Sequence, residues 1–267
     1  MATALDLLFE KVKLENRAAL IAYIPAGFPS KAGCAKAIQA LIDGGVDAIE
    51  IGFPYSDPVM DGPTIQAAAD QALAHGTSAA DVFGALSVAT GAGVPAVVMT
   101  YWNPIEKYGV RKFAESIAAA GGSGVITPDL TIEESADWQS AVKESGINSI
   151  FVVAPSTTDQ RLPLVTSQCG GFVYAASLMG VTGARSAVSQ GAADLVARVR
   201  KTTTLPVAVG LGVSTREQAK AVAGYADGVI VGSAFIKALQ EAANEEQGLK
   251  DVTELAHQLS LGVREGR

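Results

Sequence analysis

Eight short apolar runs, each followed by a segment of helical pattern, limit what this chain can fold into. The runs are ALIAYIPAG (19–27), AIEIGF (48–53), PAVVMTYW (95–102), GVITPD (124–129), SIFVVAP (149–155), FVYAAS (172–177), PVAVGLG (206–212) and GVIVGSAF (228–235). They are rich in Val, Ile and Ala without alternating polar residues, which is typical of strands buried on both faces. The pattern predicts an α/β fold, a parallel sheet closed into a (β/α)8 TIM barrel. An open doubly wound sheet is the alternative, weakened by the lack of a GxGxxG motif after the first strand.

The pattern indicates a single domain over residues 1–267. One barrel of this kind uses about 250 residues, and no Pro/Ser linker or run of charges divides the sequence. Three segments extend the basic pattern. An amphipathic stretch at 1–17 predicts an N-terminal helix, residues 76–91 predict an extra helix after the one expected at 64–75, and residues 251–261 predict a final helix on the outside.

Charge and cysteine content exclude several classes of protein. Twenty basic and 27 acidic side chains give a net charge of −7, which argues against a surface for nucleic acid or anionic membrane. The N-terminal stretch does not resemble a signal peptide, and no apolar run approaches the length of a membrane span. Cys34 and Cys169 are too few for a disulfide framework or a metal cluster. We therefore expect a cytoplasmic protein with both thiols in its core.

The segment IEIGFPYSDPVMDGPTIQ (49–66) places a carboxylate inside an apolar strand. Glu50 is the only charged residue in the middle of any predicted strand, and none of the eight contains lysine or arginine. A buried carboxylate is costly unless it is paired, and a loop residue such as Arg185 is the remaining structural partner. The pattern favours function. A low-dielectric strand end would raise the pKa of Glu50, so that the group can hold and give a proton near neutral pH.

A second carboxylate, Asp61, follows on the loop after this strand. Pro54 cannot continue a ladder and the residues after it form a turn, so the loop carries Asp61 to the same mouth as Glu50. The run DGPT also resembles the start of a helix, with Pro63 near the first helical position. The residues alone therefore leave two roles open for Asp61, as a helix cap and as a catalyst.

Other chemistries lack the residues that they need. A Schiff-base aldolase requires a lysine at a strand end, and no such lysine is present. Transition-metal sites usually draw on histidine, and the two in this chain, His75 and His257, are placed as a capping residue and a tail residue. We expect no metal site, and acid–base work falls to carboxylates and tyrosines.

Small residues follow the last three predicted strands, at Gly180–Ala184, Gly210–Ser214 and Gly232–Phe235. Backbone N–H groups in such loops can approach an anion closely, and the loops after strands seven and eight form the recurrent phosphate site of these barrels. The sequence predicts a small phosphorylated ligand. The segment Thr182–Gly191, rich in small and polar residues, is a candidate lid over it.

These motifs together resemble the tryptophan synthase alpha subunit family over nearly the whole chain. Beside the segment 49–66, the match includes YIPAGFPS (23–30), GVTGAR (180–185) and GVIVGSAF (228–235), in the family's order. The resemblance implies retro-aldol cleavage of indole-3-glycerol phosphate to indole and D-glyceraldehyde 3-phosphate, a step of L-tryptophan biosynthesis, without a cofactor in this chain.

The resemblance also implies roles for individual residues. Glu50 would protonate C3 of the indole and serve as base for the glycerol hydroxyl, and Asp61 would stabilise the charge that develops at the indole N–H, with Tyr174 near the reacting groups. The residues expected to bind the rest of the substrate are Tyr23, Met99, Tyr101, Ile126, Thr182, Leu211 and Ile230. Those expected at the phosphate are Gly183, Gly212, Gly232 and Ser233.

The family resemblance further implies a partner, a tryptophan synthase beta subunit that carries pyridoxal phosphate, in an α2β2 heterotetramer. The loop Pro54–Pro58 and the segment near Trp102–Asn103 would face it. Three alternatives remain open at this point. They are a free-standing indole-3-glycerol-phosphate lyase, a sugar-phosphate isomerase on the same fold, and a regulatory module, against which the presence of both carboxylates speaks.

Overall fold

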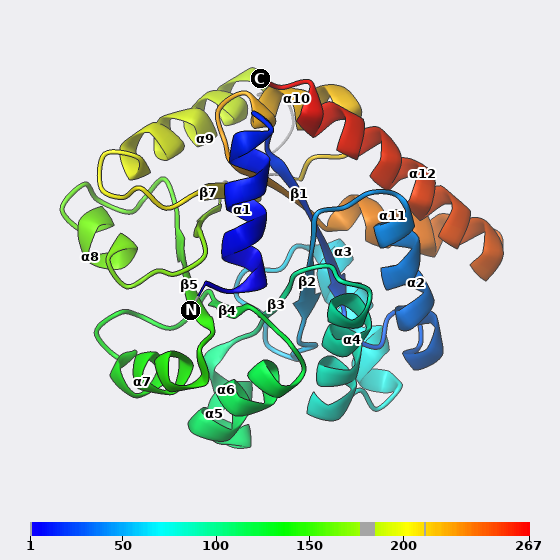
Figure 1. Ribbon diagram of the computed structural model, residues 1–267. Helices are drawn as coiled ribbons and strands as arrows, with labels where there is room; N and C mark the ends of the chain where they lie inside the picture. Colours follow the sequence, from blue (N-terminus) through cyan, green and yellow to red (C-terminus); the bar gives the residue numbers. More distant parts are fainter. Residues whose placement is uncertain (1, 177–184, 211) are drawn as a thin grey trace.

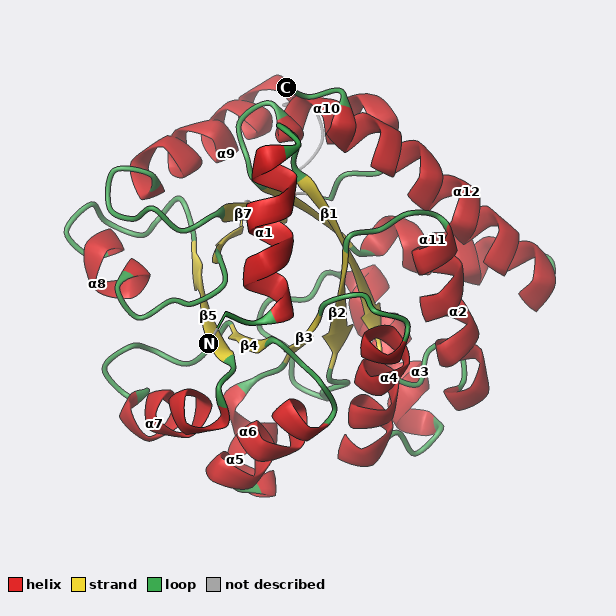
Figure 2. Ribbon diagram, in the orientation of Figure 1, coloured by secondary structure: helices red, strands yellow, loops and turns green. Residues whose placement is uncertain are grey.

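The eight predicted strands form a closed parallel barrel, β1 to β8 in sequence order (Figures 1 and 2). The computed structural model of the chain describes residues 2–176, 185–210 and 212–267, and the side chains of 185–190 are not described. The strands are β1 (Ala19–Pro25), β2 (Ala48–Gly52), β3 (Ala96–Met99), β4 (Gly124–Thr127), β5 (Asn148–Val153), β6 (Val173–Ala176), β7 (Val207–Gly210) and β8 (Gly228–Val231).

Closure of the sheet decides between the two predicted architectures. β1 pairs in parallel with both β2 and β8, so no edge strand remains. Five of the strands, β1 to β4 and β8, are buried along their whole length, which explains their continuous apolar sequence. The barrel prediction is confirmed, and the open sheet is wrong.

Helices surround the barrel, as Figure 2 shows in red. They are α1 (Ala4–Leu14), α2 (Lys31–Asp43), α3 (Pro63–Ala74), α4 (Ala79–Gly91), α5 (Trp102–Tyr108), α6 (Val110–Ala119), α7 (Ala136–Ser145), α8 (Leu162–Thr166), α9 (Arg185–Val199), α10 (Arg216–Ala223), α11 (Ser233–Glu241) and α12 (Glu245–Arg264). The predicted extra helix is α4. The final helix begins earlier than predicted, because the Asn244 side chain caps its first turn by accepting from the Gln247 amide at 2.9 Å.

Helix α1 lies across the end of the barrel at which the strands begin (Figure 1). The hydroxyl oxygen of its N-cap, Thr3, accepts a hydrogen bond from Nδ2 of Asn148, the first residue of β5, at 3.0 Å. Its Phe9 ring packs against Phe172, just before β6, with ring centres 5.6 Å apart. The helix therefore covers the amino end of the barrel and leaves the carboxyl end to the loops that follow the strands.

Three smaller predictions have different outcomes. Cys34 is buried and Cys169 half-buried, so only the first is a full core residue, and both thiols are free. His75 is the C-cap of α3, as its position before Gly76 suggested. Within the described ranges, no helix is both long and apolar enough to span a membrane.

Candidate active site

A cavity of about 660 Å³ opens at the carboxyl ends of the strands. Nine of the residues proposed from sequence line it, and they come from β1, β2, β3, β6, β8 and the loops between. They are Tyr23, Glu50, Asp61, Met99, Tyr174, Gly212, Ile230, Gly232 and Ser233. The barrel thus brings to one place side chains that lie up to 210 positions apart in the sequence, from Tyr23 to Ser233.

Glu50 is a buried carboxyl group without a cation. Its side chain is 2 % exposed, and within the described residues its Oε2 accepts no hydrogen bond and the carboxylate has no ion pair. Burial raises the pKa of Glu50 to about 8, and the nearby negative charge of Asp61 adds to the rise. The group therefore carries a proton at neutral pH and lies where it can donate it into the cavity. The side chain of Arg185, the one structural partner considered from sequence, lies outside the description.

Asp61 lies on the loop between β2 and α3, half-buried at the cavity wall. Gly62, not Asp61, holds the N-cap position of α3, and the structure gives this helix no side-chain cap. Asp61 therefore does not cap this helix, which was one of the two roles that the sequence left open. Burial raises the pKa of Asp61, and a hydrogen bond from the Tyr101 hydroxyl opposes that rise.

Tyr101 fixes the loop that carries Asp61. Its hydroxyl accepts a hydrogen bond from the Met60 amide at 3.1 Å while it donates to the Asp61 carboxylate. The ring is 1 % exposed and packs on Tyr55, with ring centres 5.3 Å apart. Tyr101 does not line the cavity itself, so its contact with the site runs through Asp61.

Two tyrosines cross the cavity floor over glycines of the neighbouring strands. A β-carbon at Gly52 would overlap the Tyr23 hydroxyl, and one at Gly210 would overlap the Tyr174 hydroxyl. These glycines make room for the rings. Burial, with Asp61 and Glu50 nearby, raises the pKa of both tyrosines well above the usual value. Both phenols therefore stay neutral and can donate hydrogen bonds.

The cavity wall beside β7 and β8 has the features of an anion site. Gly212 has a φ of +66°, a left-handed conformation that favours glycine, and Gly232 is the N-cap of α11. Gly232 and Ser233, at the start of α11, line the cavity, and the first N–H groups of a helix are suited to binding an anion. Thr182, Gly183 and Leu211, also proposed from sequence, lie outside the described residues.

The residues proposed from sequence and the residues that line the cavity differ in two places. Ile126 was proposed but is a core residue of β4 beside Met99, outside the cavity lining. Conversely, residues 152 and 154–157, at the end of β5, line the cavity without having been proposed. The carboxyl-end position of this segment was the available signal, since every βα loop of a barrel meets at that face. In the described chain, no group of three His, Cys, Asp or Glu residues is arranged to hold a metal ion.

Comparison with known proteins gives one consistent result. Residues 9–264 match the family model described as tryptophan synthase alpha chain. Proteins of that name from Streptomyces avermitilis and Acidothermus cellulolyticus are 55 % and 52 % identical to this chain. The first alignment covers 95 % of this chain and 92 % of the relative, and the second covers 98 % and 97 %.

Solved structures agree with the sequence relatives. A chain of Mycobacterium tuberculosis tryptophan synthase superposes with a TM-score of 0.92 at 49 % identity, over 99 % of both chains. The tryptophan synthase alpha chain of Legionella pneumophila reaches 0.88 at 30 % identity, over 98 % of both chains. The likeness therefore covers the barrel, the extra helices and the final helix together.

Proposed function

The chain belongs to the tryptophan synthase alpha chain family, and on that premise we propose that Glu50 is the general acid of its reaction and Asp61 the group that stabilises developing charge. The family carries out the alpha reaction of tryptophan biosynthesis, cleavage of indole-3-glycerol phosphate to indole and glyceraldehyde 3-phosphate. The protein is accordingly a carbon–carbon lyase. Family membership speaks against the sugar-phosphate isomerase that the sequence left open.

The observation that carries the proposal is the state of Glu50. Retro-aldol cleavage requires a proton at C3 of the indole, so that the ring can accept the electron pair of the breaking bond. A carboxyl group with a pKa of about 8 holds that proton at neutral pH. After donation, the carboxylate can take the proton of the glycerol hydroxyl as the carbonyl forms, so one residue serves as acid and then as base.

Protonation at C3 leaves positive charge on the indole nitrogen. Asp61 is the second carboxylate of the cavity, and an ionised group there stabilises this charge as it develops. Because the charge is absent from the bound substrate, the interaction raises the rate of cleavage rather than the affinity for substrate. We assign the neutral hydroxyls of Tyr23 and Tyr174, which both line the cavity, to hydrogen bonds with the glycerol oxygens. Met99 and Ile230 supply an apolar wall for the indole ring.

We assign the phosphate to the β7–β8 wall, held by backbone N–H groups at Gly212, Gly232 and Ser233. Gly183 and Thr182 belong to this proposal on the family resemblance alone, as a phosphate contact and as a lid residue that closes toward Asp61. Leu211 belongs to the proposed indole pocket on the family resemblance alone. Ile126 lies beside Met99 outside the cavity lining, and Tyr101 acts on the pocket by positioning Asp61.

The test is indole release by the purified chain with Glu50→Gln, a nearly isosteric change that removes the carboxyl proton. We expect kcat for indole-3-glycerol phosphate cleavage to fall by about 10² to 10⁴, with KM little changed. A loss below about tenfold would remove Glu50 from the role of general acid. Glu115→Gln, the same change at an exposed position of α6 away from the cavity, is the matched control.

The family also implies a beta-subunit partner, and we propose that it docks beside Asp61 in an α2β2 assembly. Val59 and Met60 are 75 % and 36 % exposed, and the Tyr55 hydroxyl accepts from Asn103 Nδ2 at 3.1 Å, so the loop 54–60 and the start of α5 form one surface. We propose that pyridoxal phosphate is held by the beta subunit and that this chain needs no cofactor of its own. We also propose that the protein is cytoplasmic.

Turnover with and without a beta subunit separates this coupled enzyme from a free-standing lyase of the same fold. We expect the beta subunit to raise kcat for cleavage. Full activity of the isolated chain, unchanged on adding the partner, would favour the free-standing enzyme. A Val59→Asp variant should weaken the stimulation, whereas Leu164→Asp, also at an exposed apolar residue but on α8, should not.

A further inference from the structure

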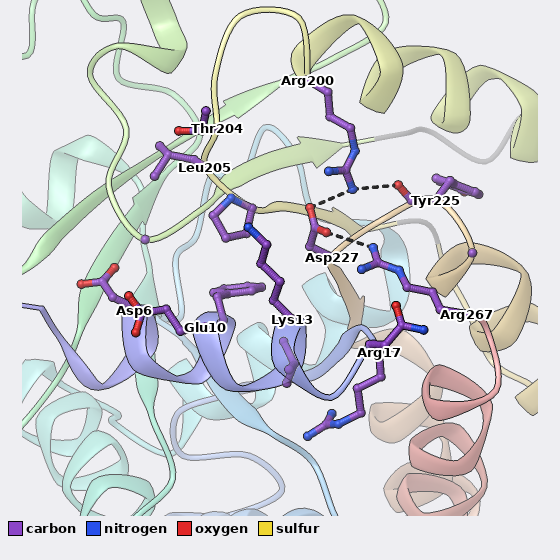
Figure 3. A pocket seen from close by; sticks show the side chains of 16 residues that line it. Asp6, Glu10, Lys13, Arg17, Arg200, Thr204, Leu205, Tyr225, Asp227 and Arg267 are labelled. Carbon is purple, nitrogen blue, oxygen red and sulfur yellow. Dashed lines mark hydrogen bonds and ion pairs between the residues drawn. The ribbon is translucent and has the colours of Figure 1, made fainter.

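A second cavity, of about 680 Å³, lies at the opposite end of the barrel from the two carboxylates. One side is formed by α1, and the others by Gly171, residues 204–206, residues 224, 225 and 227, and Arg267 (Figure 3). It is as large as the cavity assigned to catalysis, and the proposed reaction does not use it.

Two arginines share one carboxylate in this cavity. Arg200 and Arg267 each place an Nη2 at 2.9 Å from a different oxygen of Asp227, one on either side of it (Figure 3). Two guanidinium groups on one carboxylate leave a positive charge in excess. Within the described residues, Nε and Nη1 of Arg200 make no hydrogen bond, so donors remain available.

A third cation points into the same space. Lys13 extends from α1 toward the wall that carries Leu205 (Figure 3), and no carboxylate of the described chain lies within 4 Å of its ammonium group. Arg17, on the same rim, is different because it is bound by Asp47 and Glu15. A local excess of positive charge is unexpected on a chain whose net charge is −7.

The acidic residues of the lining do not cancel this excess locally. Asp6 and Glu10 lie at the other end of the cavity from the arginines (Figure 3). The Asp6 carboxylate is occupied by the backbone N–H of Thr3 and by Asn148. At the basic end of the cavity, two arginines therefore share the single carboxylate of Asp227, and Lys13 lies between them and the acidic end.

Apolar side chains complete the cavity next to these cations. Phe9 and Val12 come from α1, and Leu205 and Pro206 from the segment before β7. An inorganic ion would leave this surface in contact with water, whereas an anion with an apolar body would cover it.

We propose that this cavity binds a small organic carboxylate, with its charged group between Lys13 and Arg200 and its apolar body against Phe9 and Leu205. Charge-assisted hydrogen bonds to the carboxylate supply orientation, and burial of the body supplies part of the affinity. This site is independent of the catalytic cavity, so its failure would leave the proposed lyase function untouched.

Benzoate is the probe, and the amide signals of the ¹⁵N-labelled full chain are the readout. Gly171 and Gly224 line the proposed site, whereas Gly212 and Gly232 line the catalytic cavity. We expect saturable shifts at Gly171 and Gly224. Benzyl alcohol, which has the same ring without the charge, should produce no saturable shift at the same concentrations.

Variants distinguish specific binding from general attraction. Lys13→Ala should weaken benzoate binding about threefold, as expected for an exposed charge pair, and Arg200→Ala about tenfold. Lys11→Ala, on the same helix but paired with Glu15, should leave binding unchanged. Lys13 is exposed, so its variant keeps the test valid even where Arg200→Ala disturbs the fold. Shifts confined to Gly212 and Gly232, equal losses in the Lys11 and Lys13 variants, or no saturable shift would each overturn the proposal.

Discussion

The two ends of this barrel treat buried charge in opposite ways. At the amino end, Arg17 is 4 % exposed and donates from both Nη atoms to Asp47, at 2.8 Å each. At the carboxyl end, Glu50 is 2 % exposed and has no cation within the described residues. Arg17 and Glu50 are buried to a similar degree, so burial alone does not distinguish a structural charged group from a catalytic one. The presence of a partner does.

The pKa of each carboxylate follows from this difference. Burial alone would raise the pKa of Asp227, but hydrogen bonds from the Val207 amide and from Arg267 and Arg200 hold it below its usual value. Among the described residues no such donor reaches Glu50 Oε2, and burial takes its pKa to about 8. One end therefore keeps its carboxylates ionised and stabilises the fold, while the other keeps a carboxyl group protonated at a cost in stability.

Breaking the amino-end pair should have the largest effect. Arg17→Met leaves Asp47, whose side chain is only 10 % exposed, without its cation, and we expect the free energy of unfolding in urea to fall by about 3 kcal/mol. The activity per folded molecule should not change. Lys11→Met, which removes only a surface pair with Glu15, should cost at most about 0.5 kcal/mol. Equal losses in the two variants would contradict the buried-pair argument.

At the carboxyl end, Asp61→Asn tests charge rather than fold. The amide keeps the shape but not the negative charge, so we expect kcat for cleavage to fall about a hundredfold. Binding of the phosphorylated substrate should persist, because its phosphate contacts other residues. Steady-state kinetics measure both, and unchanged turnover would remove Asp61 from catalysis.

Dependence of stability on pH should separate Glu50 from the paired carboxylates. Its pKa is about 8 in the folded chain against a usual 4.5, so between these pH values the folded state holds a proton that the unfolded state has released. Its contribution to stability is complete below pH 4.5 and is lost as pH rises through 8. We expect the stability of Glu50→Gln relative to wild type to increase over this window, by up to about 1.4 kcal/mol per pH unit.

Chemical unfolding of both proteins at pH 5, 6, 7 and 8 measures this difference and cancels the titrations of groups that do not interact with Glu50. A flat difference would mean that Glu50 is ionised in the folded chain at neutral pH. The kcat of wild type should fall above about pH 8 for the same reason, because the proton for C3 is then lost.

The smallest effect concerns the contact that positions Asp61. Tyr101→Phe removes the hydroxyl that bonds the Met60 amide and the Asp61 carboxylate, and we expect kcat to fall about fivefold with KM nearly constant. Tyr108→Phe is the matched control, since it removes a hydroxyl bonded to Ser116 away from the cavity. A fall in both variants would indicate a general loss of stability.

Most of the fold and the centre of the site could be predicted from the sequence. The barrel followed from eight apolar runs, because strands buried on both faces cannot alternate. Glu50 followed from its position in mid-strand without a cation among the strands. The bounds of the final helix were not predicted well, because its start depends on one cap at Asn244 rather than on periodicity.

Other features depend on residues that meet only in the folded chain. The residues left two roles open for Asp61, and the structure excludes helix capping by placing Gly62 at the N-cap, while the catalytic role stays a proposal. Tyr101 was expected against the substrate, but its hydroxyl contacts the loop 60–61, some forty residues earlier. The cavity below α1 joins the first helix to the last residue of the chain, and no local pattern indicates that pairing.

The sequence by itself determined the class of fold, the buried carboxyl group and the family, because burial pattern, charge and motif order are properties of the chain. Only the tertiary structure decided which charges are neutralised. Arg17 and Glu50 are both ionisable residues in or next to apolar strands. The sequence around each does not show which of them will have a partner of opposite charge. That depends on distances between strands and loops in three dimensions, and electrostatic energy in a low-dielectric interior changes steeply with those distances.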